Sequence, residues 1–222
     1  MTENKWYRST GQDGDVVIST RVRLARNLPR VPFPACMNPE QKRQAADTIL
    51  KALPERGYRV IDMHTLPHIT ALSLVERHLI SPEFSKREEG SVLCLSEDES
   101  ASLMIGEEDH LRIQVMQAGL ELDRAYRTAD ELDTALDSRL HFAFDDRLGY
   151  LTQCPTNLGT GMRASLMLHL PALQDGGAIQ QLANTVSKLG LTIRGLYGEG
   201  SKPEGAIYQL SNQVTLGISE SA

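Results

Sequence analysis

The sequence predicts an α+β fold, with a mostly antiparallel β-sheet flanked by helices. Three short apolar stretches, at 91–96, 101–105 and 111–116, follow one another with only turns between them. Consecutive strands without helices between them pair in the antiparallel sense. The stretch 120–140 has apolar residues at helical spacing and supplies a long packing helix. With 222 residues and 41% hydrophobic content, one such domain is the simplest organisation, although two small domains stay possible.

Composition limits the partners and the compartment. The formal net charge of -6 disfavours a general nucleic-acid or membrane-binding surface, because such surfaces carry a basic excess. Cys36, Cys94 and Cys154 lie far apart with no CxxC pair, which predicts neither a disulfide framework nor a zinc site. The N-terminal stretch has no apolar core of a signal peptide, and no apolar run is long enough to span a membrane. We therefore expect a cytoplasmic protein that binds neither nucleic acid nor membrane.

The N-terminal part begins with a polar lead at 1–14, which we expect to be flexible. A β-branched run at 16–22 then predicts the first strand. Within and after it, Arg21 and Arg23 fall two apart and so share one face, and Arg26 follows nearby. These arginines fit either a solvated edge strand or a bidentate site for phosphate oxygens.

The next elements are scaffold. Asn38 and Pro39 are typical of a helix start, and an apolar stripe continues that helix as far as Leu53. A strand at 58–63 and a helix at 69–79 follow, before the three strands already described.

The connection "GEEDHLR" at 106–112 lies between the last two of those strands. It places three acids beside a histidine and an arginine. From the residues alone, a polar hairpin is the preferred interpretation.

The stretch 147–171 organises the chain. A strand at 148–152 leads into a glycine-rich turn, after which 163–170 is predicted as a helix that Pro171 ends. Cys154 then stands at the end of a strand, just before a turn and a helix N-terminus that suit an anion and lower the pKa of a thiol. The alternative is a buried structural cysteine.

The C-terminal part continues with a helix at 177–189 and a strand at 191–194. Four glycines within 195–205 then predict either a mobile lid or a plain surface hairpin. Strands at 207–210 and 214–218 are expected to close the sheet.

Three strings, "STRVRLAR" at 19–26, "GEEDHLR" at 106–112 and "CPTNLGTGMRAS" at 154–165, resemble the signatures of the ATP:guanido phosphotransferases. This is the family of arginine kinase, creatine kinase and the bacterial protein-arginine kinases. The resemblance extends over nearly all of the chain and implies the guanido kinase catalytic fold, which is similar to that of glutamine synthetase, over 15–222. Gly106 departs from the usual asparagine of the second string. Met167 replaces the histidine of the small-substrate members and resembles the protein-arginine kinases.

The resemblance also implies roles for individual residues. Glu108 and Glu199 match the acids that grip the guanidinium substrate, and Cys154 matches a thiolate beside it. His78 matches a histidine beside the adenine ring. Mg²⁺ accompanies ATP, with no protein side chain assigned as its ligand. The other implied ATP-binding positions are Ser19, Thr20, Arg21, Val22, Arg23, Arg112, Arg163, Ala164, Ser165, Leu166, Met167, Arg194, Gly195 and Gly198.

The function implied first is transfer of the γ-phosphoryl group of Mg-ATP to arginine side chains in proteins. Two alternatives stay open: a kinase of a free guanidino compound such as arginine, and a non-catalytic ATP-binding domain of the same fold. From the resemblance we expect a catalytic domain without the N-terminal helical domain of the small-substrate members, which favours an open site and protein substrates. We likewise expect no C-terminal dimerisation domain of the protein-arginine kinase type, and hence a monomer.

Overall fold

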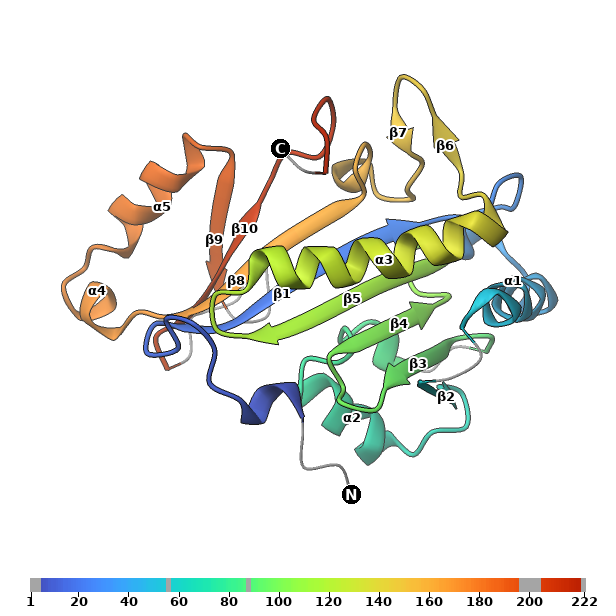
Figure 1. The fold of residues 1–222 in the computed structure, drawn as a ribbon, viewed down its shortest axis with the longest axis horizontal. Helices are drawn as coiled ribbons and strands as arrows, with labels where there is room; N and C mark the ends of the chain where they lie inside the picture. The colour runs from blue at the N-terminus through green and yellow to red at the C-terminus, as the bar shows by residue number, and fades with distance from the viewer. Residues whose placement is uncertain (1–4, 55–56, 87–88, 196–204, 221–222) are drawn as a thin grey trace.

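An eight-stranded antiparallel sheet forms the centre of the protein, in the order β2-β3-β4-β5-β1-β8-β10-β9 (Figure 1). The computed structural model describes residues 5–54, 57–86, 89–195 and 205–220. The predicted α+β class is confirmed. The strands are β1 Val17–Arg26, β2 Tyr58–Asp62, β3 Val92–Ser96, β4 Ala101–Ile105, β5 Leu111–Ala118, β8 Met162–His169, β9 Leu191–Gly195 and β10 Ile207–Asn212, and a separate two-stranded ribbon joins β6 Phe144–Asp145 to β7 Gly149–Tyr150.

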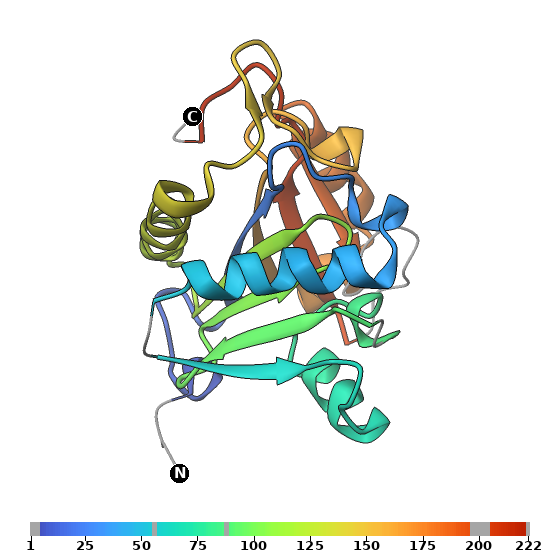
Figure 2. The same ribbon diagram turned by 90° about the vertical axis from the view of Figure 1, so that its right-hand side faces the viewer.

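Helices cover both faces of the sheet. Two long helices pack on one face, as Figures 1 and 2 show, and a shorter helix packs on the other face over β3 and β4. The α-helices are α1 Pro39–Ala52, α2 His68–Glu76, α3 Leu122–Leu140, α4 Pro171–Asp175 and α5 Ile179–Ser187, with short 3-10 turns η1 Trp6–Arg8, η2 Pro34–Cys36, η3 Phe84–Lys86 and η4 Pro155–Asn157.

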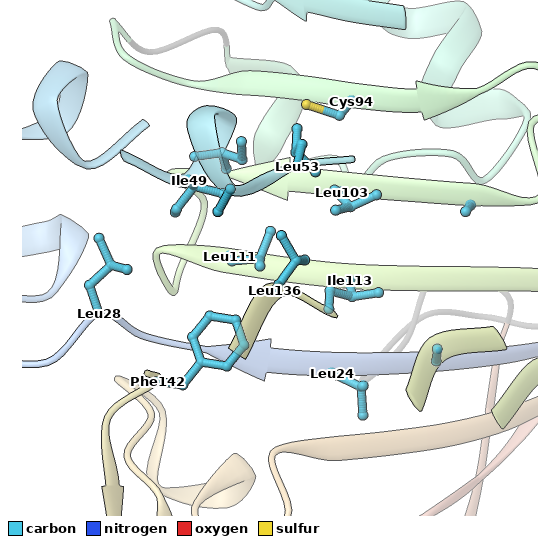
Figure 3. Packing of buried hydrophobic residues seen from close by; sticks show 14 of the residues in the cluster. Leu24, Leu28, Ile49, Leu53, Cys94, Leu103, Leu111, Ile113, Leu136 and Phe142 are labelled. Carbon is cyan, nitrogen blue, oxygen red and sulfur yellow. The ribbon is translucent and has the colours of Figure 1, made fainter. Parts of the chain in front are cut away.

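The main core lies between the sheet and the pair α1 and α3 (Figure 3). Leu24 and Ile113 point from the sheet toward Ile49 of α1 and Leu136 of α3, and all four side chains are fully buried. Removing apolar side chains of this size from water is the main favourable contribution to folding, about 1.5 to 3 kcal/mol each. The start of α1 is as predicted: Asn38 Oδ1 accepts a hydrogen bond from Gln41 N at 2.9 Å, and the Gln41 side chain bonds back to the Asn38 N–H.

The predicted helix at 163–170 is wrong, because this stretch forms the central strand β8 between β1 and β10. Its residues have good helix propensity, and Leu166 and Leu170 are spaced as on a helix. The same stretch also alternates, however, with Arg163 and Ser165 on one face and Ala164 and Leu166 on the other. Pairing on both sides decides in favour of the strand, since packing and pairing override weak propensities. In place of the α-helix N-terminus expected near Cys154, the three-residue 3-10 turn η4 follows this cysteine.

The C-terminal segment also differs from the prediction. The stretch 214–218 contains no strand. Instead, Thr215 holds the loop before β8: its carbonyl accepts a hydrogen bond from Thr160 N at 2.9 Å, and its hydroxyl donates to Leu158 O at 2.8 Å. The predicted strand at 148–152 is reduced to β7, and α5 buries none of its described residues completely.

Arg26 lies on the opposite face of β1 from Arg21 and Arg23. It is completely buried, and it donates to both Asp133 carboxylate oxygens and, at 2.6 Å, to Glu220. The guanidinium also lies over the Tyr150 ring, 3.5 Å from its centroid. This arginine is a structural cation that ties β1 to α3 and the C-terminal segment.

Candidate active site

Five arginines from four strands line one cavity of about 200 Å³, named here the arginine cavity. The alternation of β1 directs Arg21 and Arg23 to the same face. The antiparallel register then sets Arg163 directly opposite Arg23 and Arg112 opposite Ala25. Arg194 of β9 completes the set, which is Arg21, Arg23, Arg112, Arg163 and Arg194.

These cations are held in an unfavourable environment. Burial, followed by the charges of Arg112 and Arg163, lowers the pKa of Arg21 to about 10. Burial and the same kind of repulsion lower the pKa of Arg23 well below its ordinary value, and its buried Nε has no hydrogen-bond partner among the described residues. Burial and Arg194 also lower the pKa of Arg163. A polyanion bound here would relieve this repulsion, which is how phosphate sites are built.

The arginine cavity has a second side made of apolar groups. Val75, Ile80 and Met104 line it together with His78, whose backbone has a left-handed φ of 57°. Burial, and then the charge of Arg21, lowers the pKa of His78, so the neutral imidazole is favoured. A neutral ring beside apolar side chains suits a flat aromatic ligand group.

Glu108 and Cys154 line a neighbouring cavity of about 220 Å³, named here the thiol cavity. Arg112 lines both cavities, and its guanidinium bonds to Glu107 at 2.6 Å and to Glu108 at 2.9 Å. The Glu108 side chain keeps 37% of its surface exposed, whereas Glu107 keeps 6%. The Cys154 Sγ lies 3.1 Å from the hydroxyl of Thr156, which belongs to η4, the turn that begins directly after Cys154. Glu108 is thus the acid of this pair that a ligand can reach.

A buried polar hub connects the acid turn to the cysteine loop. Asp109 is fully buried, and its Oδ1 accepts from the Asn27 side chain at 2.7 Å and from Gln153 N at 2.8 Å. The Asn27 carboxamide oxygen accepts from His110 N at 2.9 Å. Sequence reasoning missed these residues. The signal that could have indicated them is the pair Asp109 and His110 directly after the two glutamates. A solvated hairpin does not require these two residues, so their presence was an indication that they have buried partners.

The structure separates the remaining predicted ATP-binding positions into two groups. Ser19, Ser165 and Met167 lie with Arg21 around a small hollow beside the arginine cavity. The alternate residues of β1 and β8 point to the other face, where Val22 is part of the main core and the Thr20 hydroxyl donates to Gly119 O at 2.6 Å. Positions on that other face are Thr20, Val22, Ala164 and Leu166.

The last predicted positions belong to the C-terminal loop. Gly195 ends β9 and is buried opposite Tyr208. Glu199 and Gly198, and the lid predicted around them, lie outside the described residues. Within the described ranges, no three His, Cys, Asp or Glu side chains are grouped closely enough to hold a metal ion. Every described helix is also too short or too polar to cross a membrane.

An antiparallel sheet that gathers five arginines beside a carboxylate and a thiol has the charge distribution of domains that handle phosphate groups. The sequence profile of the ATP:guanido phosphotransferase C-terminal catalytic domain matches residues 41–222, and the chain belongs to this family. The resemblance noted from the three strings is therefore confirmed.

Relatives and solved structures agree with this membership. Over 98% of the chain, 48% of residues are identical to a protein-arginine kinase of Symbiobacterium thermophilum, and over 97% of it, 47% are identical to one of Halothermothrix orenii. The chain spans 64% and 62% of the lengths of these two proteins.

The duplicated taurocyamine kinase of Schistosoma mansoni superimposes with a TM-score of 0.86 at 28% identity, over 95% of this chain and 31% of that one. Lombricine kinase, at 22% identity and a TM-score of 0.81 over 99% of this chain and 64% of that one, shares the fold.

Proposed function

We propose that this domain transfers the γ-phosphoryl group of Mg-ATP to a guanidinium nitrogen of arginine side chains in proteins. The observation that carries the proposal is that Arg23, Arg112 and Arg163 line both the arginine cavity and the thiol cavity. A triphosphate held in the first cavity would therefore present its terminal phosphate to an acceptor held in the second. The names of the relatives support an arginine side chain as that acceptor.

The five arginines act on the nucleotide. Phosphoryl transfer needs mainly positioning and stabilisation of charge on the phosphate oxygens. Arginine suits both tasks because its guanidinium is planar and makes bidentate contacts with phosphate. Mg²⁺ would enter on the ATP phosphates and neutralise part of their charge. The apolar side with His78 is the proposed place of the adenine ring. The predicted ATP-binding positions on the other face of β1 and β8 would support the site by forming the sheet, and their side chains would not contact the nucleotide.

Glu108 and Cys154 act on the acceptor. A guanidinium keeps its proton at neutral pH and is delocalised, so its nitrogen is a poor nucleophile. Carboxylates that pair with it fix its orientation and accept the proton that leaves. In the proposed step, the N–P bond forms as the bond from the γ-phosphorus to the ADP oxygen breaks, and the proton passes to a carboxylate. Glu108 is one proposed acid, Glu199 is the second, and the Cys154 thiolate adds a third negative contact. Free cysteines such as Cys154 are typical of a reducing compartment, and we place the activity in the cytoplasm.

The proposal is tested by incubating the domain with γ-labelled Mg-ATP and either an unstructured protein or free arginine. We expect acid-labile phosphate on arginine residues of the protein. Turnover of free arginine without protein labelling would instead assign a small guanidino substrate. Binding of Mg-ATP with neither activity would make the domain a non-catalytic binder.

Cys154→Ala tests the acceptor side of the site. We expect a large loss of rate with nearly unchanged ATP affinity, because the thiol lines the thiol cavity and not the arginine cavity. Cys36→Ala is the matched control, since Cys36 is an exposed cysteine that lines neither cavity. Equal activity of Cys154→Ala and the control would return Cys154 to a structural role.

A further inference from the structure

A third cavity of about 320 Å³ adjoins the other two, and we name it the Gln153 cavity. It shares Glu108 and Arg112 with the thiol cavity. It also shares Glu83 and Arg112 with the arginine cavity, but none of the other four arginines of that cavity lines it. Its volume falls within the range of pockets that hold small ligand groups. The remaining lining residues are Phe84, Lys86, Ser91, Gly106, Glu107 and Gln153.

Transfer chemistry restricts how an acceptor can arrive. The attacking nitrogen and the leaving ADP oxygen lie roughly in line on opposite sides of the transferred phosphorus. With the nucleotide in the arginine cavity, the body of the acceptor must extend away from that cavity. The Gln153 cavity begins at Glu108, on the carboxylate side of the site, and so provides such a direction.

The walls of this cavity suit an arginine side chain on a polypeptide. Ser91 and Gly106 are small lining residues, and the largely buried Phe84 is the apolar lining residue available to an aliphatic stem. Glu83, Glu107 and Glu108 carry more negative charge than Lys86 and Arg112 carry positive charge. Gln153, directly before Cys154, adds a carboxamide whose oxygen accepts a hydrogen bond from Ala35 N at 3.3 Å and whose N–H groups can donate to a polypeptide backbone.

Hydrogen bonds also connect the lining residues of the Gln153 cavity to the residues around Glu108 and Cys154. The Ser81 hydroxyl donates to Glu107, the carboxylate that holds Arg112, and the same hydroxyl accepts from Phe84 N at 3.1 Å. On the other side, Gln153 is fixed through its backbone N–H to the buried Asp109. Both walls are therefore positioned by the residues that position Glu108 and Cys154.

From this arrangement we infer that the Gln153 cavity is the entry site for a substrate arginine, and that Gln153 and Glu83 determine binding of the flanking polypeptide. The inference rests on the proposed function for its chemistry. It makes a separate claim about binding, which can be measured without turnover.

The binding test uses alkylation of the partly exposed Cys154 by iodoacetamide in a Cys36→Ala background, which removes the exposed thiol of Cys36. The probe is a Gly-Ser peptide with one central arginine, compared with the same peptide carrying lysine. We expect the arginine peptide to slow alkylation of the parent. Gln153→Trp fills the cavity and should weaken this protection by about tenfold or more in peptide concentration. Gln181→Trp on α5 is the matched control.

A charge variant gives an independent check. Glu83→Lys should weaken protection by the arginine peptide, whereas Glu131→Lys on the opposite face of the sheet should not. Binding of Mg-ATP should be unchanged in Gln153→Trp, Gln181→Trp and Glu131→Lys. Glu83 also lines the arginine cavity, so Glu83→Lys is judged by peptide protection alone. Failure of the peptide to protect the parent, or equal protection of Gln153→Trp and Gln181→Trp, overturns the inference. Protection without any protein labelling by the parent would contradict the proposed function and leave the entry site standing.

Discussion

Replacing Arg21 by glutamine should stabilise the ligand-free domain. Arg21 is a base whose pKa in the folded protein is lowered, so the folded state disfavours its charged form. This cost is fully present at any pH below the folded pKa and disappears as the pH rises through about 10 toward the unfolded value of 12.5. The shift from 12.5 to about 10 corresponds to at most about 3 kcal/mol at neutral pH.

Two effects reduce that magnitude. Arg21 is only half-buried, so solvent screens part of the repulsion. Its Nε also donates to the Ser165 hydroxyl at 3.3 Å, a bond whose loss costs about 1 kcal/mol. We therefore expect Arg21→Gln to raise the free energy of unfolding by roughly 1 to 2 kcal/mol at pH 7. Urea denaturation measures this difference, and Arg127→Gln on the exposed side of α3 is the control.

With Mg-ATP bound, the parent should become more stable than Arg21→Gln, which reverses their order without nucleotide. A ligand that binds only the folded state adds about 2.7 kcal/mol at one hundred times its dissociation constant. The parent should gain this stabilisation, and Arg21→Gln should lose most of it because a phosphate contact is removed. A variant that is less stable than the parent without nucleotide, or that is stabilised by Mg-ATP as strongly as the parent, would refute the assignment of a strained phosphate site.

Two further predictions concern buried ion pairs away from the arginine cavity. Asp133→Ala should lower the free energy of unfolding by about 3 to 5 kcal/mol in urea denaturation, because it leaves the buried Arg26 cation with Glu220 as its remaining acid; a loss below about 1 kcal/mol would contradict this role. At Glu99, burial opposes ionisation, but the hydrogen bond from Lys5 and the charge of Arg77 outweigh it and hold the pKa below its ordinary value. The resulting stability is present above the unfolded pKa and is lost as the pH falls through the folded pKa, so the deficit of Glu99→Gln should shrink in acid. A deficit that stays constant with pH in thermal unfolding would exclude that linkage.

Local patterns were sufficient for the elements whose partners are close in sequence. The strands 91–96, 101–105 and 111–116 pair through short turns, and the structure has them as β3, β4 and β5. The capped helix after Asn38 and the long helix α3 are likewise local features, determined by their own termini and stripes. These predictions succeeded because one segment contains all the information that they need.

The stretch 163–170 required information from distant segments. Its strand state depends on β1, which lies far earlier in the chain, and on β10, which comes later. A single sequence does not contain that pairing in local form, and the helix-favouring composition of the stretch dominated the prediction. The hub of Asn27, Asp109 and Gln153 is similar, because its three members come from three separated loops.

In the candidate site, too, some features were predictable from the local sequence and others depended on distant segments. Period-two alternation correctly put Arg21 and Arg23 on one face. Their meeting with Arg112, Arg163 and Arg194 depends on the register of four strands and was available beforehand only from the family resemblance. For Glu199, the sequence prediction stays a prediction.

The alternation of β1 connects the stability of the fold to its proposed chemistry. Val22 and Leu24 are fully buried against α1 and α3, so the strand has a strong preference for which face meets the core. A slip of one residue would turn Arg21 and Arg23 into that core and expose the apolar residues, because side chains alternate strictly along a strand. The cost of burying two unpaired cations excludes this register. The apolar face of β1 therefore determines the direction of its charged face. The same core packing that offsets the repulsion among the arginines also directs their side chains into the arginine cavity.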